Sequence, residues 1–77
     1  MIEWQDHITV NPKVLYGKPV ITGTRVPVDL IIEKLAMGES FDYLLSSYPH
    51  IKMEQVLACL SYATYLIRNE ESILTPA

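Results

Sequence analysis

The stretch YGKPVITGTRVPV, residues 16–28, places two glycines and two prolines around a run of β-branched residues. Gly17 and Gly23 can adopt positive φ at little cost, so each predicts a tight turn. Pro19 and Pro27 fix their own φ and favour extended backbone in the residue before them. The stretch therefore predicts an ordered unit of turns and strands that leads into a helix near residue 29.

Two strands are predicted within this unit, and another lies before it. Residues 20–22 favour a half-buried strand, and residues 24–26 are predicted to return beside it as a hairpin. Residues 8–10 are predicted as a further short strand. Because so small a sheet is barely stable alone, we expect it to lie on helices or to pair with a second copy through an exposed edge at Ile8 and Val10.

Three helices are predicted after the β unit, over residues 29–37, 41–47 and 53–68. Gly38 is placed to end the first helix, and Ser40 is placed to cap the N-terminus of the second. A short helix and a long helix joined by a proline-bearing turn suit a helix-turn-helix.

The third predicted helix carries apolar residues on more than one face. One series, with steps of three and four residues, is predicted to face the core: Met53, Val56, Leu57, Leu60, Ala63, Thr64 and Ile67. A second series lies on adjoining faces: Cys59, Tyr62, Tyr65 and Leu66. We expect this second series to need another surface, and assign it with the strand edge to a homodimer interface.

Length and composition predict one folded domain. The 77 residues divide into a β arm and hairpin-like unit (1–28), a three-helix core (29–68) and a frayed tail (69–77). Hydrophobic residues make up 49% and are dispersed in periodic segments, as in a globular domain. No apolar run approaches the roughly 18 residues of a membrane span, and the N-terminus lacks the pattern of a signal peptide. We therefore expect a cytoplasmic protein without membrane contact.

The aromatic residues indicate an interaction protein. Five tyrosines, with Trp4 and Phe41, exceed what one small core readily buries, and Tyr and Trp are favoured at interfaces. Trp4 itself is expected to cover the core or to contact a partner. The alternative is a larger core in which the tyrosine rings are half exposed.

Catalysis finds little support in the sequence. His7 and His50 are far apart, and Cys59 lies among apolar neighbours, where a thiol is usually inert. A single cysteine and the absence of a Cys/His cluster give no disulfide and no metal site. We expect a protein that is not an enzyme and that needs no cofactor.

The few cations include a candidate contact site for an anion or a partner. Arg25 can hold a carboxylate or phosphate with two parallel hydrogen bonds, and Lys13 and Lys18 could join it in a small basic patch. The alternative is an ion pair, within the chain or between subunits, that joins Arg25 to Asp29, Asp6 or Glu3 and fixes the β element to the first helix.

A net charge of −3 and a pI of about 5.1 argue mildly against DNA as a high-affinity partner. If the helix-turn-helix reads DNA, Gln55 would pair with adenine and Lys52 would contact phosphate. Glu54 would repel the backbone, and phosphate binding depends on clustered cations. A basic protein partner fits this charge better, and a three-helix core without DNA binding remains the alternative.

Glycines and prolines recur at fixed offsets along most of the chain. These are Asn11-Pro12, Gly17-x-Pro19-Val20-Ile21-x-Gly23-Thr24-Arg25-Val26-Pro27-Val28, Gly38-x-Ser40 and Tyr48-Pro49, followed by an apolar helix. The spacing, over roughly residues 6–67, resembles the small prokaryotic family called domain of unknown function 433. The resemblance implies a small helix-turn-helix-like protein that acts as an antitoxin-like partner of a ribonuclease-type (PIN-like) toxin.

Together, these observations predict a mainly α-helical domain with a short N-terminal β element. Its three helices are expected to form a helix-turn-helix-like domain of the homeodomain or winged-helix type. The expected function is that of a non-catalytic, dimeric antitoxin-like protein that binds a toxin encoded nearby, with operator DNA as a further candidate partner. The alternative is a homodimeric protein-interaction module that binds no nucleic acid.

Overall fold

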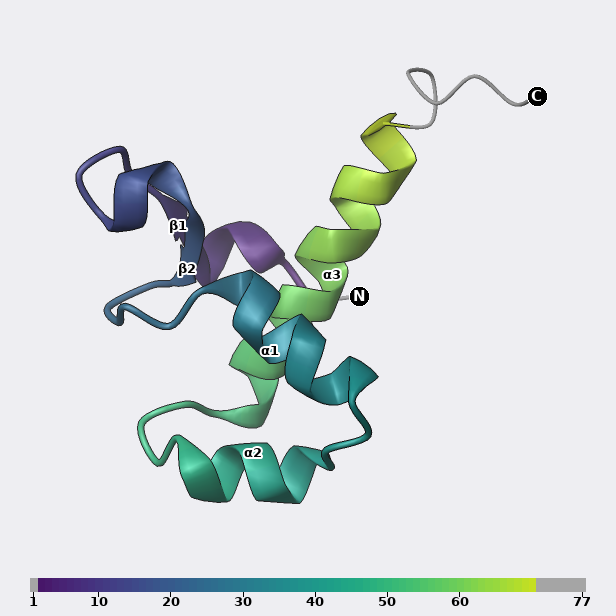
Figure 1. The fold of residues 1–77 in the computed structure, drawn as a ribbon. Helices are drawn as coiled ribbons and strands as arrows, with labels where there is room; N and C mark the ends of the chain where they lie inside the picture. The colour runs from purple at the N-terminus through teal and green to yellow at the C-terminus, as the bar shows by residue number, and fades with distance from the viewer. Residues whose placement is uncertain (1, 71–77) are drawn as a thin grey trace.

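A computed structural model describes residues 2–70 as a mainly helical domain with a small sheet near the N-terminus (Figure 1). The elements in order are a 3-10 turn (Trp4–Asp6), β1 (Ile8–Val10), a second turn (Leu15–Gly17), β2 (Pro19–Ile21), α1 (Val28–Ala36), α2 (Phe41–Ser47) and α3 (Met53–Glu70). The first turn, β1, α1 and α2 all contact α3. Within residues 2–70, no helix combines the length and hydrophobicity needed to cross a bilayer.

The sheet differs from the predicted hairpin. β1 pairs antiparallel with β2, and Ile8 is opposite Ile21. The predicted return strand over residues 24–26 is wrong, because the Thr24 hydroxyl holds this segment in a turn. Its Oγ1 donates to the Ile21 carbonyl at 2.7 Å and accepts from the Val26 N–H at 3.0 Å. Only an isolated bridge between Val20 and Pro27 follows, so β2 pairs mainly with the earlier strand.

The connection between the strands contains an unusual turn. Leu15, Tyr16 and Gly17 have φ values of 47°, 56° and 85°. Positive φ suits glycine but strains residues that carry a Cβ. The Tyr16 side chain is fully exposed, so no packing contact of that ring offsets the strain.

The helices lie close to their predicted bounds. α1 begins and ends one residue earlier than predicted, and α2 spans the predicted residues. The N-cap at Ser40 is confirmed, since its Oγ accepts from the Tyr43 N–H at 3.1 Å. α3 starts as predicted but continues to Glu70, so residues 69 and 70 are helical. The rest of the predicted frayed tail, residues 71–77, lies outside the described residues.

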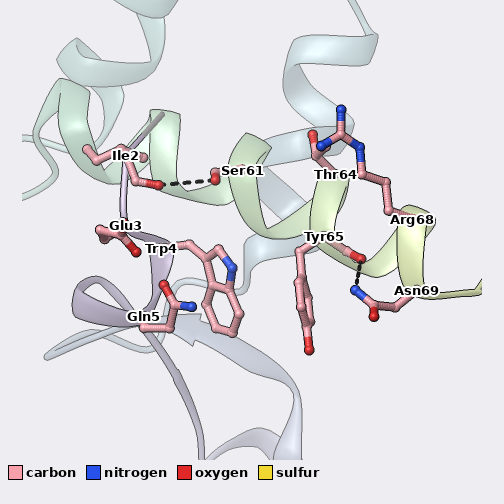
Figure 2. A pocket seen from close by; sticks show the side chains of 9 residues that line it. All are labelled: Ile2, Glu3, Trp4, Gln5, Ser61, Thr64, Tyr65, Arg68 and Asn69. Atoms are coloured by element: carbon pink, nitrogen blue, oxygen red, sulfur yellow. Dashed lines mark hydrogen bonds between the residues drawn. The ribbon is translucent and has the colours of Figure 1, made fainter.

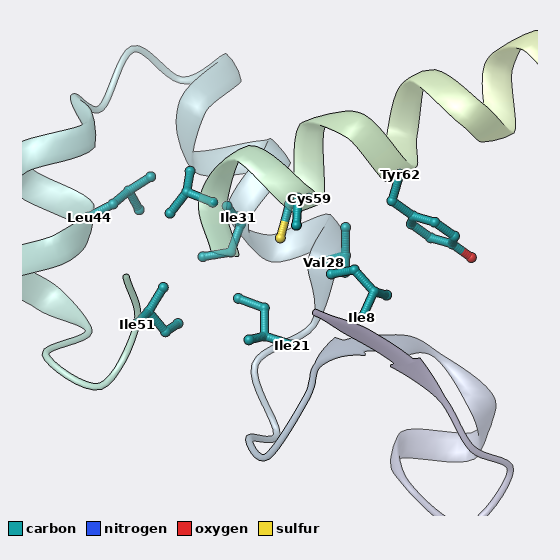
Figure 3. Packing of buried hydrophobic residues seen from close by; sticks show 10 residues of the cluster. Ile8, Ile21, Val28, Ile31, Leu44, Ile51, Cys59 and Tyr62 are labelled. Carbon is teal, nitrogen blue, oxygen red and sulfur yellow. The ribbon is translucent and has the colours of Figure 1, made fainter. Parts of the chain in front are cut away.

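The core lies where α1, α2 and the sheet meet α3 (Figure 3). Five side chains have almost no exposed surface: Ile21, Ile31, Leu44, Val56 and Cys59. They come from four elements that the fold brings together, β2, α1, α2 and α3, and Leu44 is the one buried side chain of the short helix α2. Burial of this apolar surface is the main favourable term for so small a domain.

The faces of α3 are arranged differently from the prediction. Cys59 and Tyr62 face the core, at 0% and 8% exposure, although both were expected to need a partner surface. Leu57 and Ile67 were expected in the core but are 40% and 67% exposed. The reason is that the N-terminal arm, the sheet and α1 lie against the Cys59 and Tyr62 side of α3. Val56 is buried as predicted.

Candidate functional site: the surfaces around α3

An N-terminal arm, residues 2–6, is fastened across the middle of α3. The Ser61 hydroxyl donates to the Ile2 carbonyl at 3.2 Å, joining residues 59 positions apart. The Trp4 ring lies 4.7 Å from the Tyr62 ring and 5.1 Å from the Tyr65 ring, between centroids. Such tilted aromatic pairs stabilise packing beyond the area they bury. Trp4 therefore covers the core, which is one of the two roles expected for it.

A hollow of mixed polarity lies between this arm and the C-terminal half of α3 (Figure 2). Its lining combines the aromatic rings with hydrogen-bonding and charged groups: Ile2, Glu3, Trp4, Gln5, Ser61, Thr64, Tyr65, Arg68 and Asn69. Figure 2 shows Trp4 beside Tyr65, and the Asn69 side-chain amide donates to the Tyr65 carbonyl at 2.7 Å. Opposite charges from Glu3 and Arg68 give the hollow no single electrostatic preference.

An apolar groove, lined in part by Tyr62, lies between β2, α1 and α3. It has a volume of about 560 Å³ and is lined by Lys18, Pro19, Val28, Asp29, Ile32, Glu33, Tyr62, Ala63 and Leu66. The Lys18 ammonium pairs with the Asp29 carboxylate at 2.9 Å, and both side chains are more than half exposed. An exposed ion pair of this kind contributes about 0 to 1 kcal/mol to stability. The pair lies at the border of the groove and does not close it.

The three predicted contact cations do not share one site. Lys18 lines the apolar groove, whereas Arg25 lines a separate hollow beside β1. Lys13 is exposed and lines neither of these two surfaces. Asp29 is paired with Lys18, and no ion pair among the described side chains includes Arg25. Within the described part of one chain, Arg25 therefore forms no ion pair with Asp29, Asp6 or Glu3. A pair between two copies of the chain stays a prediction, and Arg25 stays a candidate contact residue.

The two predicted DNA contacts form a helix cap. The Gln55 Oε1 atom accepts from the Lys52 backbone N–H at 2.8 Å, at the start of α3. This is the reciprocal half of a capping box, in which a Gln at the third helical position reaches back to the N-cap. Only half of the sequence signal was present, because the N-cap is a lysine, and Gln55 was considered only for DNA. Its amide oxygen is engaged within the chain, while the Lys52 side chain is exposed.

The predicted dimer-interface residues divide into two groups. Ile8, Cys59 and Tyr62 are buried by this chain's own side chains and offer almost no surface to a partner. Val10, Tyr65 and Leu66 are 55%, 46% and 37% exposed. Val10, Tyr65 and Leu66 are therefore the predicted interface residues that a partner could contact, and their role in a dimer interface stays a prediction.

Reactive groups do not converge in the described part of the chain. Burial raises the pKa of the Cys59 thiol to about 12, so the nucleophilic thiolate is strongly disfavoured. His7 lies at the start of β1, and the exposed His50 lies in the turn before α3. Residues 2–70 contain no cluster of His, Cys, Asp and Glu side chains that could hold a metal ion.

Sequence reasoning missed one surface of α3. Its exposed large apolar side chains include Met53, Leu57 and Ile67, all of which were placed in the core. Together with Leu60 and Thr64 they follow steps of four, three, four and three residues, which is the spacing of a helix-pairing stripe. The spacing was recognised in the sequence, but the stripe was assigned to the core, because spacing alone does not show which face of a helix is covered.

Comparison with known proteins places these features in a family. A family model described as "Protein of unknown function (DUF433)" matches residues 8–63. An uncharacterized protein of Sinorhizobium fredii, y4eO, is 36% identical over 73% of this chain, which spans only 25% of that relative's length. The crystal structure of a DUF433 member from Anabaena variabilis is similar, with a TM-score of 0.78 and 26% identity over 88% of this chain and 67% of that one. The matched residues and the shared three-helix arrangement show that this chain belongs to the DUF433 family.

Proposed function

We propose that this protein is a non-catalytic, antitoxin-like binding protein whose partner is a ribonuclease-type (PIN-like) toxin. The antitoxin class follows from the family resemblance. The observation that supports a binding role is the apolar groove between α1 and α3, together with the exposed aromatic and aliphatic side chains around it. A single chain that leaves this much apolar surface in contact with water is suited to covering it with a partner.

The chemistry of the groove defines the partner segment that fits it. Ile32, Ala63 and Leu66 supply apolar surface, and Glu33 adds an exposed carboxylate at the border. An amphipathic segment would place its apolar side chains between the helices and a basic residue beside Glu33. The net charge of −3 favours association with a basic protein in the same way.

The finer fold assignment, a helix-turn-helix of homeodomain or winged-helix type, is part of this proposal. The short α2, the turn over residues 48–52 and the long α3 have the required order. Operator binding by a dimer is the secondary role, with Lys52 as a phosphate contact. The engagement of Gln55 in the cap and the exposed carboxylate of Glu54 weaken base reading by this end of α3.

The partner role is tested with the product of a toxin-like gene adjacent to the one encoding this chain. We expect the two proteins to co-purify and the ribonuclease activity of the partner to fall in the complex. Leu66→Glu, which places a charge in the groove, should weaken the complex at least about tenfold. Met37→Glu is the matched control, because Met37 is 72% exposed and lies outside the groove. Equal affinity of both variants, or failure of the wild-type pair to associate, would contradict the proposal.

The DNA role is tested separately, by titrating the protein against the DNA upstream of its own gene over a range of salt concentrations. A specific complex should weaken steeply as salt rises, and Lys52→Ala should reduce that slope. Absence of binding at low salt, with and without the protein partner, would leave a protein-interaction module without nucleic-acid binding.

A further inference from the structure

The exposed stripe on α3 has the spacing of a helix that pairs with another helix. It consists of Met53, Leu57, Leu60, Thr64 and Ile67. Met53, Leu57 and Ile67 are 38%, 40% and 67% exposed, and the two central residues are half-buried. Alternating steps of four and three keep side chains on one side of a helix over about 21 Å, at 1.5 Å per residue. The described part of this chain does not cover the stripe.

The polar atom within the stripe is already satisfied. The Thr64 hydroxyl donates to the Leu60 carbonyl at 2.9 Å, so burial of Thr64 would leave no unpaired donor. A shallow hollow follows the centre of the stripe and is lined by Ile2, Leu57, Leu60, Ser61 and Thr64. The floor is mostly apolar, and Ile2 of the N-terminal arm widens it. This surface can receive the side chains of a second helix.

The charges beside the stripe indicate which helix fits. Glu54 and Arg68 are exposed, each directly follows an end residue of the stripe, and they are fourteen residues apart. Four turns of helix separate them, so they lie on the same edge of the stripe. If two copies of α3 lie antiparallel about a two-fold axis between Leu60 and Ser61, Glu54 of one copy lies within one residue of the level of Arg68 of the other. A parallel pair would instead place like charges at the same level.

We propose that two copies of this chain associate through this stripe, with their α3 helices antiparallel. Met53 of one copy then lies within one residue of the level of Ile67 of the other, and Leu57 lies level with Thr64. The charge pairs at the two ends fix the direction, and the apolar stripe supplies the affinity. The biological role of this dimer rests on the proposed function. The dimer leaves the apolar groove between α1 and α3 of each copy available for a partner. One helix face is small, so we expect a dissociation constant of about micromolar order.

The first experiment measures the oligomeric state of the full chain alone, by sedimentation equilibrium over a range of concentrations. We expect a dimer whose dissociation constant rises at least about tenfold in Leu57→Glu and is unchanged in Met37→Glu. Circular dichroism controls for folding, and both positions are exposed. A wild-type chain that is monomeric at about 1 mM would overturn the proposal, as would a dimer with the same dissociation constant in Leu57→Glu.

Charge reversal tests the antiparallel direction without changing the apolar stripe. Glu54→Arg and Arg68→Glu should each weaken the dimer several-fold at low salt, because each places like charges together at both ends. The double variant restores both opposite-charge pairs and should recover the wild-type dissociation constant. A double variant that is weaker than both single variants would overturn the antiparallel arrangement.

Mixed disulfide formation gives an independent test of direction. Met53→Cys and Ile67→Cys proteins should cross-link to each other when mixed, and much more slowly each to itself. Wild-type protein is the control for Cys59, whose thiol is buried. Preferential self-linking of each variant would indicate parallel helices and overturn the proposal. All these measurements use the isolated chain, so failure of the dimer is distinguishable from failure of toxin or DNA binding.

Discussion

The buried thiol of Cys59 should make this fold lose stability in alkaline solution. Cys59 has no exposed surface and lies among Ile21, Val28 and Ile31 (Figure 3). Burial raises its pKa from 9.0 to about 12. In the unfolded chain the thiol regains its ordinary pKa, so above pH 9 unfolding releases a proton that the folded chain retains. The contribution of the protonated thiol to the free energy of unfolding is therefore fully present below the unfolded-state pKa. It is lost as the pH rises from 9 towards 12.

The size of the effect follows from the two pKa values. Each pH unit between them costs about 1.4 kcal/mol, so by about pH 10.5 the free energy of unfolding should be about 2 kcal/mol lower than at neutral pH. A domain of this length has a total stability of about 4 to 12 kcal/mol, so the loss is readily measurable. Comparison with a variant that lacks the thiol assigns the loss to Cys59.

The assay is urea unfolding at several pH values for the wild type and for Cys59→Ala. Alanine keeps a small apolar side chain in the core but has no proton to lose, so the difference between the two proteins isolates the thiol. The wild type should approach or fall below the variant as the pH rises. Identical slopes for both proteins would refute the reasoning. Rapid alkylation of the native wild type by iodoacetamide at pH 8, at the rate of a free thiol, would refute it as well.

Three further predictions concern stability. Trp4→Ala should lower the free energy of unfolding by about 2 to 3 kcal/mol in urea melts, because it removes a ring that packs on Tyr62 and Tyr65; a loss below 0.5 kcal/mol would show that the arm is not anchored. Gln55→Ala should lower the free energy of unfolding by about 1 kcal/mol, and Gln55→Glu, which retains the acceptor oxygen, should lower it much less. Equal melting temperatures for these two variants would argue against the cap. Tyr16→Asn should raise stability by about 0.5 to 1 kcal/mol, since the ring makes no packing contact and asparagine tolerates positive φ better; destabilisation would indicate that the strain is absent.

Local signals in the sequence were sufficient for the helices. Residues 41–47 were predicted without error because Ser40 begins the helix and Tyr48-Pro49 ends it, and both signals act within a few residues. The start of α3 was also predicted, although its capping by Gln55 was overlooked. Hydrogen bonds between residues that are close in sequence can be predicted from the sequence alone.

Pairings over longer distances were not predictable in this way. The choice of β1 as the partner of β2 depends on a turn made by one hydroxyl, that of Thr24, in a segment whose composition also suits a strand. The face of α3 that enters the core depends on where the N-terminal arm lies. α3 is apolar on several sides, so periodicity identifies candidate stripes without saying which one is covered.

The candidate site was predicted only in part. Tyr65 and Leu66 are exposed as a partner surface requires, whereas Cys59 and Tyr62 are part of the core, where Trp4 packs on the Tyr62 ring. Arg25 and Lys18 are close in sequence but line different surfaces, because β2 and the turn after it separate them. Charged side chains in an irregular segment cannot be assigned to one binding site until the path of the backbone is known.

The bond between Ile2 and Ser61 also affects how the chain acquires its structure during synthesis. The ribosome makes the N-terminal arm and β1 first, but the helix on which they pack is produced only after some fifty further residues. Until then Trp4 and Ile8 have no native surface to cover them, and such exposed segments are prone to misassociation. Completion of the core must therefore await α3, and it depends on contacts between distant parts of the chain, which form more slowly than local ones.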